Sequence, residues 1–131
     1  MKKLISVKTA GSILLVCLGL LALFHVLVLV RLLPSEIVWG GRAGGSAADL
    51  RRLESFALLV TLLFAFITAV RMGIINAGKY AKAAKIGALL IVAYMIVNTA
   101  ANLASGVTLE KLIFTPLTLL MALCALRLAL D

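Results

Sequence analysis

Charged residues divide the chain into apolar runs whose lengths match a lipid bilayer. Lys8 and Arg31 bound 22 uncharged residues, and a later run of 24 uncharged residues ends at Glu110. Two shorter runs, 55–70 and 112–126, each continue past an arginine whose long side chain can extend to the membrane surface. A helix needs about 20 apolar residues to cross a hydrocarbon core of roughly 30 Å. The pattern predicts four transmembrane helices, near residues 11–32, 54–76, 84–105 and 109–130.

We expect these helices to form a single all-α domain, an antiparallel transmembrane bundle over residues 1–131 with an extracytoplasmic loop between the first two helices. The turn at 105–110 is short enough to hold the last two helices as a hairpin. The first helix is longer than the apolar region of a typical signal peptide and lacks a small-x-small cleavage pattern, so we expect it to be retained.

Composition supports the membrane assignment and adds an orientation. Of all residues, 64% are hydrophobic, which is more than a soluble domain of this size can bury. Eight lysines and arginines fall at the termini and in the 71–85 loop, and five fall on the other side. The positive-inside rule therefore predicts cytoplasmic termini. The net charge of +8 indicates attraction to anionic membrane lipids. Nucleic acid is not an expected partner, because no basic domain extends into water.

The polar residues within the predicted helices gather in the outer half of the membrane. His25, Asn98 and Thr115 all fall about 6 Å outward from the midpoints of their helices, at a rise of about 1.5 Å per residue. Asparagine facing lipid is costly, so the polar stripe of the third helix should face other helices. Either it supplies hydrogen bonds between helices, or it lines a shared polar cavity. The stripe comprises Tyr94, Asn98, Ala101, Asn102 and Ser105.

The inner half of the third helix is predicted to serve packing. Small residues repeat there at four-residue spacing, in the pairs Ala83/Gly87 and Ala84/Ala88, and such pairs let helix backbones approach closely. In the fourth helix, Pro116 lacks a backbone donor, and we expect a kink near Thr115.

The segment PSEIVWGGR, residues 34–42, interrupts the apolar pattern. Pro34 and the two glycines stop the first helix, and the apolar Ile37 and Val38 suggest that the segment folds back onto the bundle. The ring of Trp39 suits the headgroup region. Downstream, Asp49 is a candidate cap for a helix that runs into the second span. The segment is either an interfacial anchor or a lid over an outer cavity. The candidate ligand-binding residues are His25, Glu36, Trp39, Arg42, Glu54, Asn98, Asn102 and Thr115.

Several motifs together carry a family resemblance. They are FHVLVLV around His25, PSEIVWGGR, Glu54, NTAAN at 98–102, and LEKLIFTPLTLLMALCALRLAL at 109–130. They cover most of the chain, which resembles a family of small four-helix bacterial membrane proteins of uncharacterised function. The family pattern has Phe-Glu where this chain has Leu53-Glu54, and NTxGN where it has NTAAN. The resemblance implies a four-helix fold in the bacterial inner membrane and brings no activity or substrate.

Several familiar functions do not fit the sequence. Quinone-linked thiol oxidoreductases need closely spaced cysteine pairs, whereas Cys17 and Cys124 stand alone. Small multidrug exporters need a carboxylate within the first helix, and we predict no acidic residue inside any span. One histidine without nearby cysteines is a weak metal site, and the glycines match no nucleotide-binding loop. We therefore expect no metal or other cofactor.

Three classes of function stay open. The first is a protein that binds or passes a small polar molecule or a lipid headgroup from the outer side. The second is an accessory subunit, or a homo-oligomer, whose polar residues only hold the bundle together. The third is a membrane-embedded enzyme using His25 with Glu36 or Glu54, since histidine titrates near neutral pH. The enzyme requires a carboxylate within hydrogen-bond reach of the imidazole.

Overall fold

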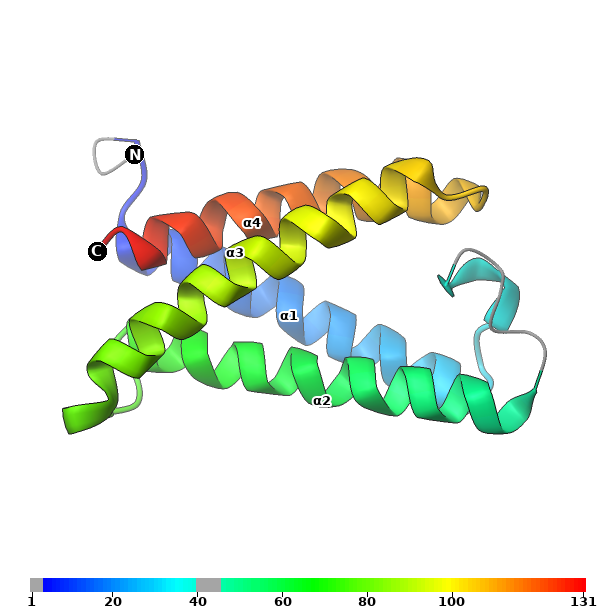
Figure 1. The fold of residues 1–131 in the computed structure, drawn as a ribbon, viewed down its shortest axis with the longest axis horizontal. Helices are drawn as coiled ribbons and strands as arrows, with labels where there is room; N and C mark the ends of the chain where they lie inside the picture. Colours follow the sequence, from blue (N-terminus) through cyan, green and yellow to red (C-terminus); the bar gives the residue numbers. More distant parts are fainter. Residues whose placement is uncertain (1–3, 40–45) are drawn as a thin grey trace.

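The computed structural model describes residues 4–39 and 46–131, and within them four α-helices form an antiparallel bundle (Figure 1). This confirms the predicted fold class. Two 3-10 turns, η1 (Ser35–Ile37) and η3 (Gly78–Tyr80), and a π-helical turn, η4 (Glu110–Phe114), lie between the helices. The helices are α1 (Val7–Leu29), α2 (Ala47–Arg71), α3 (Ala81–Ala104) and α4 (Thr115–Ala129).

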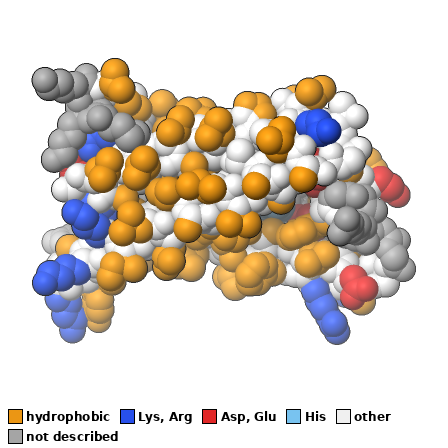
Figure 2. Space-filling model, turned by 45° about the horizontal axis from the view of Figure 1, so that its top comes forward, with side chains coloured by type: hydrophobic (Ala, Val, Ile, Leu, Met, Phe, Trp, Pro, Cys, Tyr) orange, Lys and Arg blue, Asp and Glu red, His pale blue; other side chains and the backbone are white. Residues whose placement is uncertain are grey.

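The two ends of the bundle differ. Both termini and the α2–α3 connection lie at one end, which we call the termini end (Figure 1). The α1–α2 and α3–α4 connections lie at the other, the loop end. Among the described residues, four helical segments are long and apolar enough to cross a membrane, as expected for a multi-pass membrane protein. Hydrophobic side chains cover the middle of the face in Figure 2, and charged side chains lie at its two ends.

The second helix begins earlier than the sequence pattern predicted. It starts at Ala47 rather than near 54, because the Ser46 hydroxyl caps it by accepting the Asp49 backbone N–H at 3.0 Å. The predicted cap at Asp49 is therefore wrong. The helix ends at Arg71 rather than near Asn76. Gly73 adopts a φ of 77° there, which suits glycine. This shift places Glu54 inside a membrane-spanning helix.

The tightly packed core lies toward the termini end. It includes both cysteines, and Ala84, Gly87 and Ala88 of α3 are buried as predicted, whereas Ala83 is exposed. A Cβ at Gly87 would lie 3.0 Å from the Cδ1 atom of Ile67 on α2, so glycine permits this close approach. The core residues are Ala10, Leu14, Cys17, Leu18, Phe64, Ile91, Met95, Met121, Ala122, Cys124, Ala125 and Leu128.

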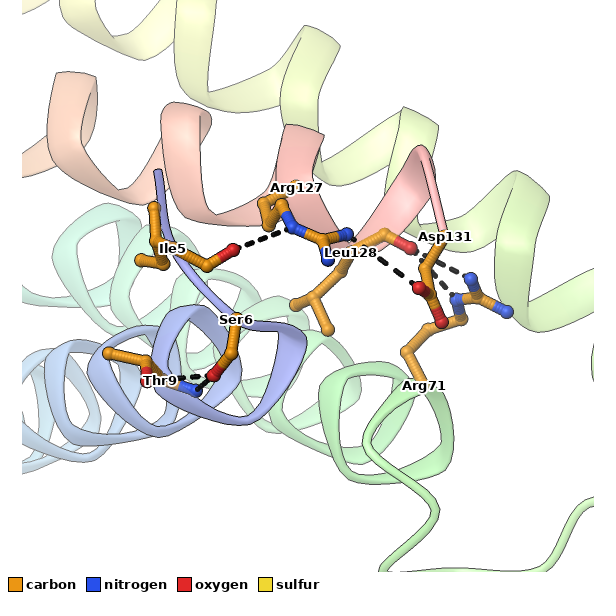
Figure 3. Close-up of polar contacts among 7 residues, drawn as sticks. All are labelled: Ile5, Ser6, Thr9, Arg71, Arg127, Leu128 and Asp131. Carbon is orange, nitrogen blue, oxygen red and sulfur yellow. Dashed lines mark hydrogen bonds and ion pairs between the residues drawn. The ribbon is translucent and has the colours of Figure 1, made fainter. Parts of the chain in front are cut away.

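Two arginines fasten the termini end (Figure 3). Arg127 is only 5% exposed, and its Nε donates to the Ile5 carbonyl oxygen at 2.9 Å. Its Nη1 lies 3.7 Å from Oδ1 of Asp131. Arg71 donates through Nε and Nη2 to the Leu128 carbonyl oxygen, at 3.2 and 2.7 Å. Both guanidinium groups thus bond to backbone within the protein. The expectation that both would extend to the membrane surface is wrong for the buried Arg127.

The fourth helix opens with a π-helical turn. The backbone N–H of Thr115 bonds to the Glu110 carbonyl oxygen, five residues earlier, and the Thr115 hydroxyl donates to the same oxygen at 3.3 Å. Pro116 follows directly and has no N–H to continue the ordinary helical pattern. The local irregularity predicted near Thr115 is therefore a π-helical turn, and it lies at the loop end.

Replacing Gly87 by valine should destabilise the bundle, because the added side chain meets Ile67. We expect the free energy of unfolding in phospholipid nanodiscs to fall by about 1–3 kcal/mol, the usual cost of overpacking. Gly19→Val is the matched control, since a Cβ at Gly19 meets nothing within 4 Å. Thermal unfolding followed by circular dichroism makes the comparison. Equal stability of the two variants would contradict the close α2–α3 contact.

Candidate functional site

The carboxylate of Glu54 is the centre of a polar cluster toward the loop end. Its side chain is 0% exposed. Its Oε2 lies 2.6 Å from Nδ1 of His25 on α1, and its Oε1 accepts the indole N–H of Trp39 at 2.7 Å. A buried carboxylate is stable only when hydrogen-bonded, and both oxygens are. When the carboxylate is ionised it only accepts, so Nδ1 of His25 is then the donor and Nε2 is the second polar atom of the ring.

The segment after α1 folds back to reach this carboxylate. Val38 is buried, and Trp39 has a φ of 55°, in the left-handed region that bulky residues rarely adopt. Such strain costs on the order of 1–3 kcal/mol and persists where the surroundings fix it. The fold-back predicted from Ile37 and Val38 is confirmed. The placement of the Trp39 ring among lipid headgroups is not confirmed. Its indole N–H is directed at Glu54, in the interior of the bundle.

A cavity of about 440 Å³ lies beside this cluster, and we call it the Glu54 cavity. Its volume falls in the range usual for small-molecule sites. All four helices contribute to its wall, together with Val38 and Trp39 and the α3–α4 connection. Five of the described lining residues are aromatic: Phe24, Trp39, Phe64, Tyr94 and Phe114. The polar ones are His25, Glu54, Thr61, Asn98, Asn102, Ser105, Glu110 and Thr118.

The polar stripe of α3 lines this cavity. Tyr94, Asn98, Ala101, Asn102 and Ser105 all form part of its wall. Within residues 4–39 and 46–131, the side-chain amides of Asn98 and Asn102 make no hydrogen bond, so they do not join α3 to another helix. The nearby link between α3 and α4 is instead a threonine pair, in which Thr99 donates to the Thr118 hydroxyl at 2.8 Å. The two asparagines are thus available to cavity contents.

A second buried carboxylate closes the loop end of the cavity. Glu110, in the π-helical turn, is 7% exposed, and Ser105 donates its hydroxyl hydrogen to Oε2. The Ser105 oxygen in turn accepts the Val107 N–H at 3.0 Å. In the sequence pattern, Glu110 is only the charge that ends an apolar run. The signal that identifies it is the serine five residues earlier, across a turn too short to keep the two side chains apart.

The structure sorts the candidate binding residues into three groups. His25, Trp39, Glu54, Asn98 and Asn102 lie together in the cavity wall. Glu36 is exposed and lies outside the wall, and Thr115 is bonded to the Glu110 carbonyl oxygen instead. Arg42 lies outside the described residues.

The statement that no acidic residue lies inside a span is wrong. Glu54 is the eighth residue of α2, about 10 Å along its axis, and Glu110 opens the last candidate span. This prediction failed because it placed the start of the second helix near residue 54, whereas α2 begins at Ala47. A buried ionisable group within a membrane-spanning helix marks a candidate functional site.

Comparison with known proteins adds no identification. A scan of protein-family models, a search of curated proteins and a search of solved structures each found no match to this chain. The geometry of the Glu54 cavity is therefore the basis for assigning a function.

The Trp39–Glu54 hydrogen bond should be measurable as a coupling energy. In a double-mutant cycle of Trp39→Phe and Glu54→Met, which has no acceptor oxygen, we expect about 1–3 kcal/mol of coupling in the free energy of unfolding. The control cycle replaces Glu54→Met by Glu36→Met, at an exposed carboxylate, and should give no coupling. Coupling below about 0.5 kcal/mol in the first cycle would show that the bond does not form in the membrane.

Proposed function

We propose that this protein binds a small polar molecule or a lipid headgroup in the Glu54 cavity. The observation that carries the proposal is the pair of asparagine amides, Asn98 and Asn102, which face the cavity without a partner in the described part of the chain. Both asparagines are half-buried, and each amide offers an oxygen acceptor and an NH₂ donor to a ligand or an ordered water in the cavity.

The remaining wall favours an organic ligand. Aromatic rings supply a large apolar contact area, and edge-to-face pairs hold them in place. Phe24 and Phe114 meet at 5.0 Å between ring centroids, and Phe64 and Tyr94 meet at 5.2 Å. A few directed polar groups within a mainly apolar wall are typical of small-molecule sites.

The proposed location is the bacterial inner membrane, with both termini in the cytoplasm. The lysine and arginine distribution supports this orientation, and the sequence resemblance supports the bacterial membrane. The cavity lies toward the loop end, so in this orientation the ligand binds on the extracytoplasmic side.

The His25–Glu54 hydrogen bond also favours a second candidate, a membrane-embedded enzyme. A carboxylate on Nδ1 orients an imidazole and leaves Nε2 to accept a proton from a substrate or water, as a general base does. In that case His25→Gln should abolish conversion of the bound molecule while leaving its binding within severalfold of the original. A plain binding protein releases the molecule unchanged.

The binding proposal predicts that filling the cavity expels its contents. Ala101 lines the cavity, whereas Ala100 is an exposed neighbour on α3 outside its wall. Purified protein should release a defined small molecule or lipid, detected by mass spectrometry, and show matching density in crystals grown from a lipid phase. Ala101→Trp should reduce the released amount about tenfold or more, as expected for a blocked site. Ala100→Trp should not change it.

Two other outcomes would count against binding. An empty cavity in both assays, with wild-type protein isolated mainly inside a larger membrane complex, would support the accessory-subunit alternative. Equal release from both tryptophan variants would mean that the molecule lies elsewhere on the surface.

The orientation can be tested by cysteine labelling. With Cys17 and Cys124 replaced by alanine, Ala48→Cys places a thiol at the loop end and Lys82→Cys places one at the termini end, both at exposed positions. A membrane-impermeant maleimide should label Ala48→Cys in cells whose outer membrane alone is opened. It should label Lys82→Cys only after the inner membrane is opened. The reverse pattern would place the cavity on the cytoplasmic side.

A further inference from the structure

The Glu54 cavity contains features that narrow the class of its ligand. We propose that it binds a membrane lipid with an uncharged, hydroxyl-bearing headgroup, such as a diacylglycerol. This proposal rests on the binding function proposed above. It specifies in addition the charge of the ligand, the hydrogen bonds it makes and its route of entry from the membrane.

Both buried carboxylates in the wall are already engaged. Glu54 is 0% exposed and its two oxygens accept from His25 and Trp39, so a ligand cation gains little contact with the carboxylate. Glu110 is 7% exposed and accepts from Ser105. Among the described lining residues there is no lysine or arginine to bind an anion. An anionic headgroup therefore has no cationic partner among the described lining residues, and it would approach two carboxylates.

The groups that remain match hydroxyls. The amides of Asn98 and Asn102 lie one helical turn apart on α3, and each offers an oxygen acceptor and an NH₂ donor. Nε2 of His25 adds a further polar atom, which accepts from a hydroxyl when the ring is neutral and donates to one when it is protonated. A hydroxyl donates one hydrogen bond and accepts two, so two or three neighbouring hydroxyl or ester oxygens can satisfy this set.

The cavity reaches the surface where lipid chains lie. Tyr94, near the middle of α3, lines the cavity and is 37% exposed. The surface around it is apolar, since Leu90 and Val97 are also exposed. On the interior side, Leu21, Phe64 and Met95 extend the apolar wall. The cavity is thus apolar toward the middle of the membrane and polar toward the loop end. This polarity gradient fits an amphiphile whose acyl chain continues into the bilayer. A water-soluble polyol has no acyl chain and would leave the apolar part of the wall without a contact.

The sole tryptophan of the chain is Trp39, which lies in the cavity wall, so the fluorescence comes from a residue at the proposed site. Brominated acyl chains quench tryptophan on contact. The full-length protein is placed in nanodiscs of unbrominated phosphatidylcholine, and brominated dioleoylglycerol, phosphatidic acid or phosphatidylcholine is added at equal mole fractions. We expect the diacylglycerol to quench at the lowest mole fraction. Asn98→Ala with Asn102→Ala should raise its half-quenching mole fraction about threefold to tenfold per lost hydrogen bond.

The controls separate the alternatives. Asn76→Ala, at an exposed amide of the termini end, should leave the diacylglycerol titration unchanged. Equal or stronger quenching by phosphatidic acid or phosphatidylcholine would overturn the uncharged headgroup. Reversal of quenching by free glycerol would overturn the lipid in favour of a soluble polyol. No selective quenching, or no effect of the asparagine variants, would overturn the inference as a whole. The binding function fails separately, if the Ala101→Trp comparison finds nothing in the cavity.

Discussion

The buried carboxylate of Glu54 constrains three segments of the chain at once. It lies about 10 Å along α2 and its side chain is 0% exposed, so its oxygens require donors from the protein. His25 provides one from α1 and thereby fixes how α1 and α2 align along their lengths. Trp39 provides the other, and the chain after α1 must fold back to deliver it. The left-handed backbone at Trp39 is the local cost of that delivery.

The remaining packing divides the bundle into two unlike halves. At the termini end, Gly87 permits a close contact between α2 and α3, and Arg71 and the buried Arg127 donate to backbone carbonyl oxygens. Toward the loop end, a cavity of about 440 Å³ remains between the helices. In lipid there is no water-driven collapse to close such a space, and helix association depends on packing and hydrogen bonds. A bundle that is well packed at one end can therefore keep a cavity at the other.

The sequence was sufficient for the features that depend on periodicity and length. Four spans, the antiparallel arrangement and the α3 stripe from Tyr94 to Ser105 follow from apolar run lengths and from three- and four-residue spacing. The start of α2 did not follow, because Arg51 and Arg52 resemble a loop when charge alone marks a boundary. Only the serine cap at Ser46 distinguishes the helix there. The hydrogen bond from Trp39 to Glu54 and the burial of Glu110 depend on contacts between different segments of the chain, which periodicity does not encode.

Unpaired amides and an unusual backbone conformation both occur in the wall of the Glu54 cavity. Asn98 and Asn102 leave amide hydrogen bonds unmade in the described structure, although a threonine pair one residue away shows that α3 and α4 can bond to each other. Trp39, also in the cavity wall, has a φ of 55° that brings its indole N–H to Glu54. The two asparagine amides make no such bond within the described residues, so helix packing alone does not account for polar side chains at 98 and 102. Natural sequences usually give up local consistency at functional sites. Within residues 4–39 and 46–131 these amides are not paired across helices, so there they do not serve to hold the bundle together.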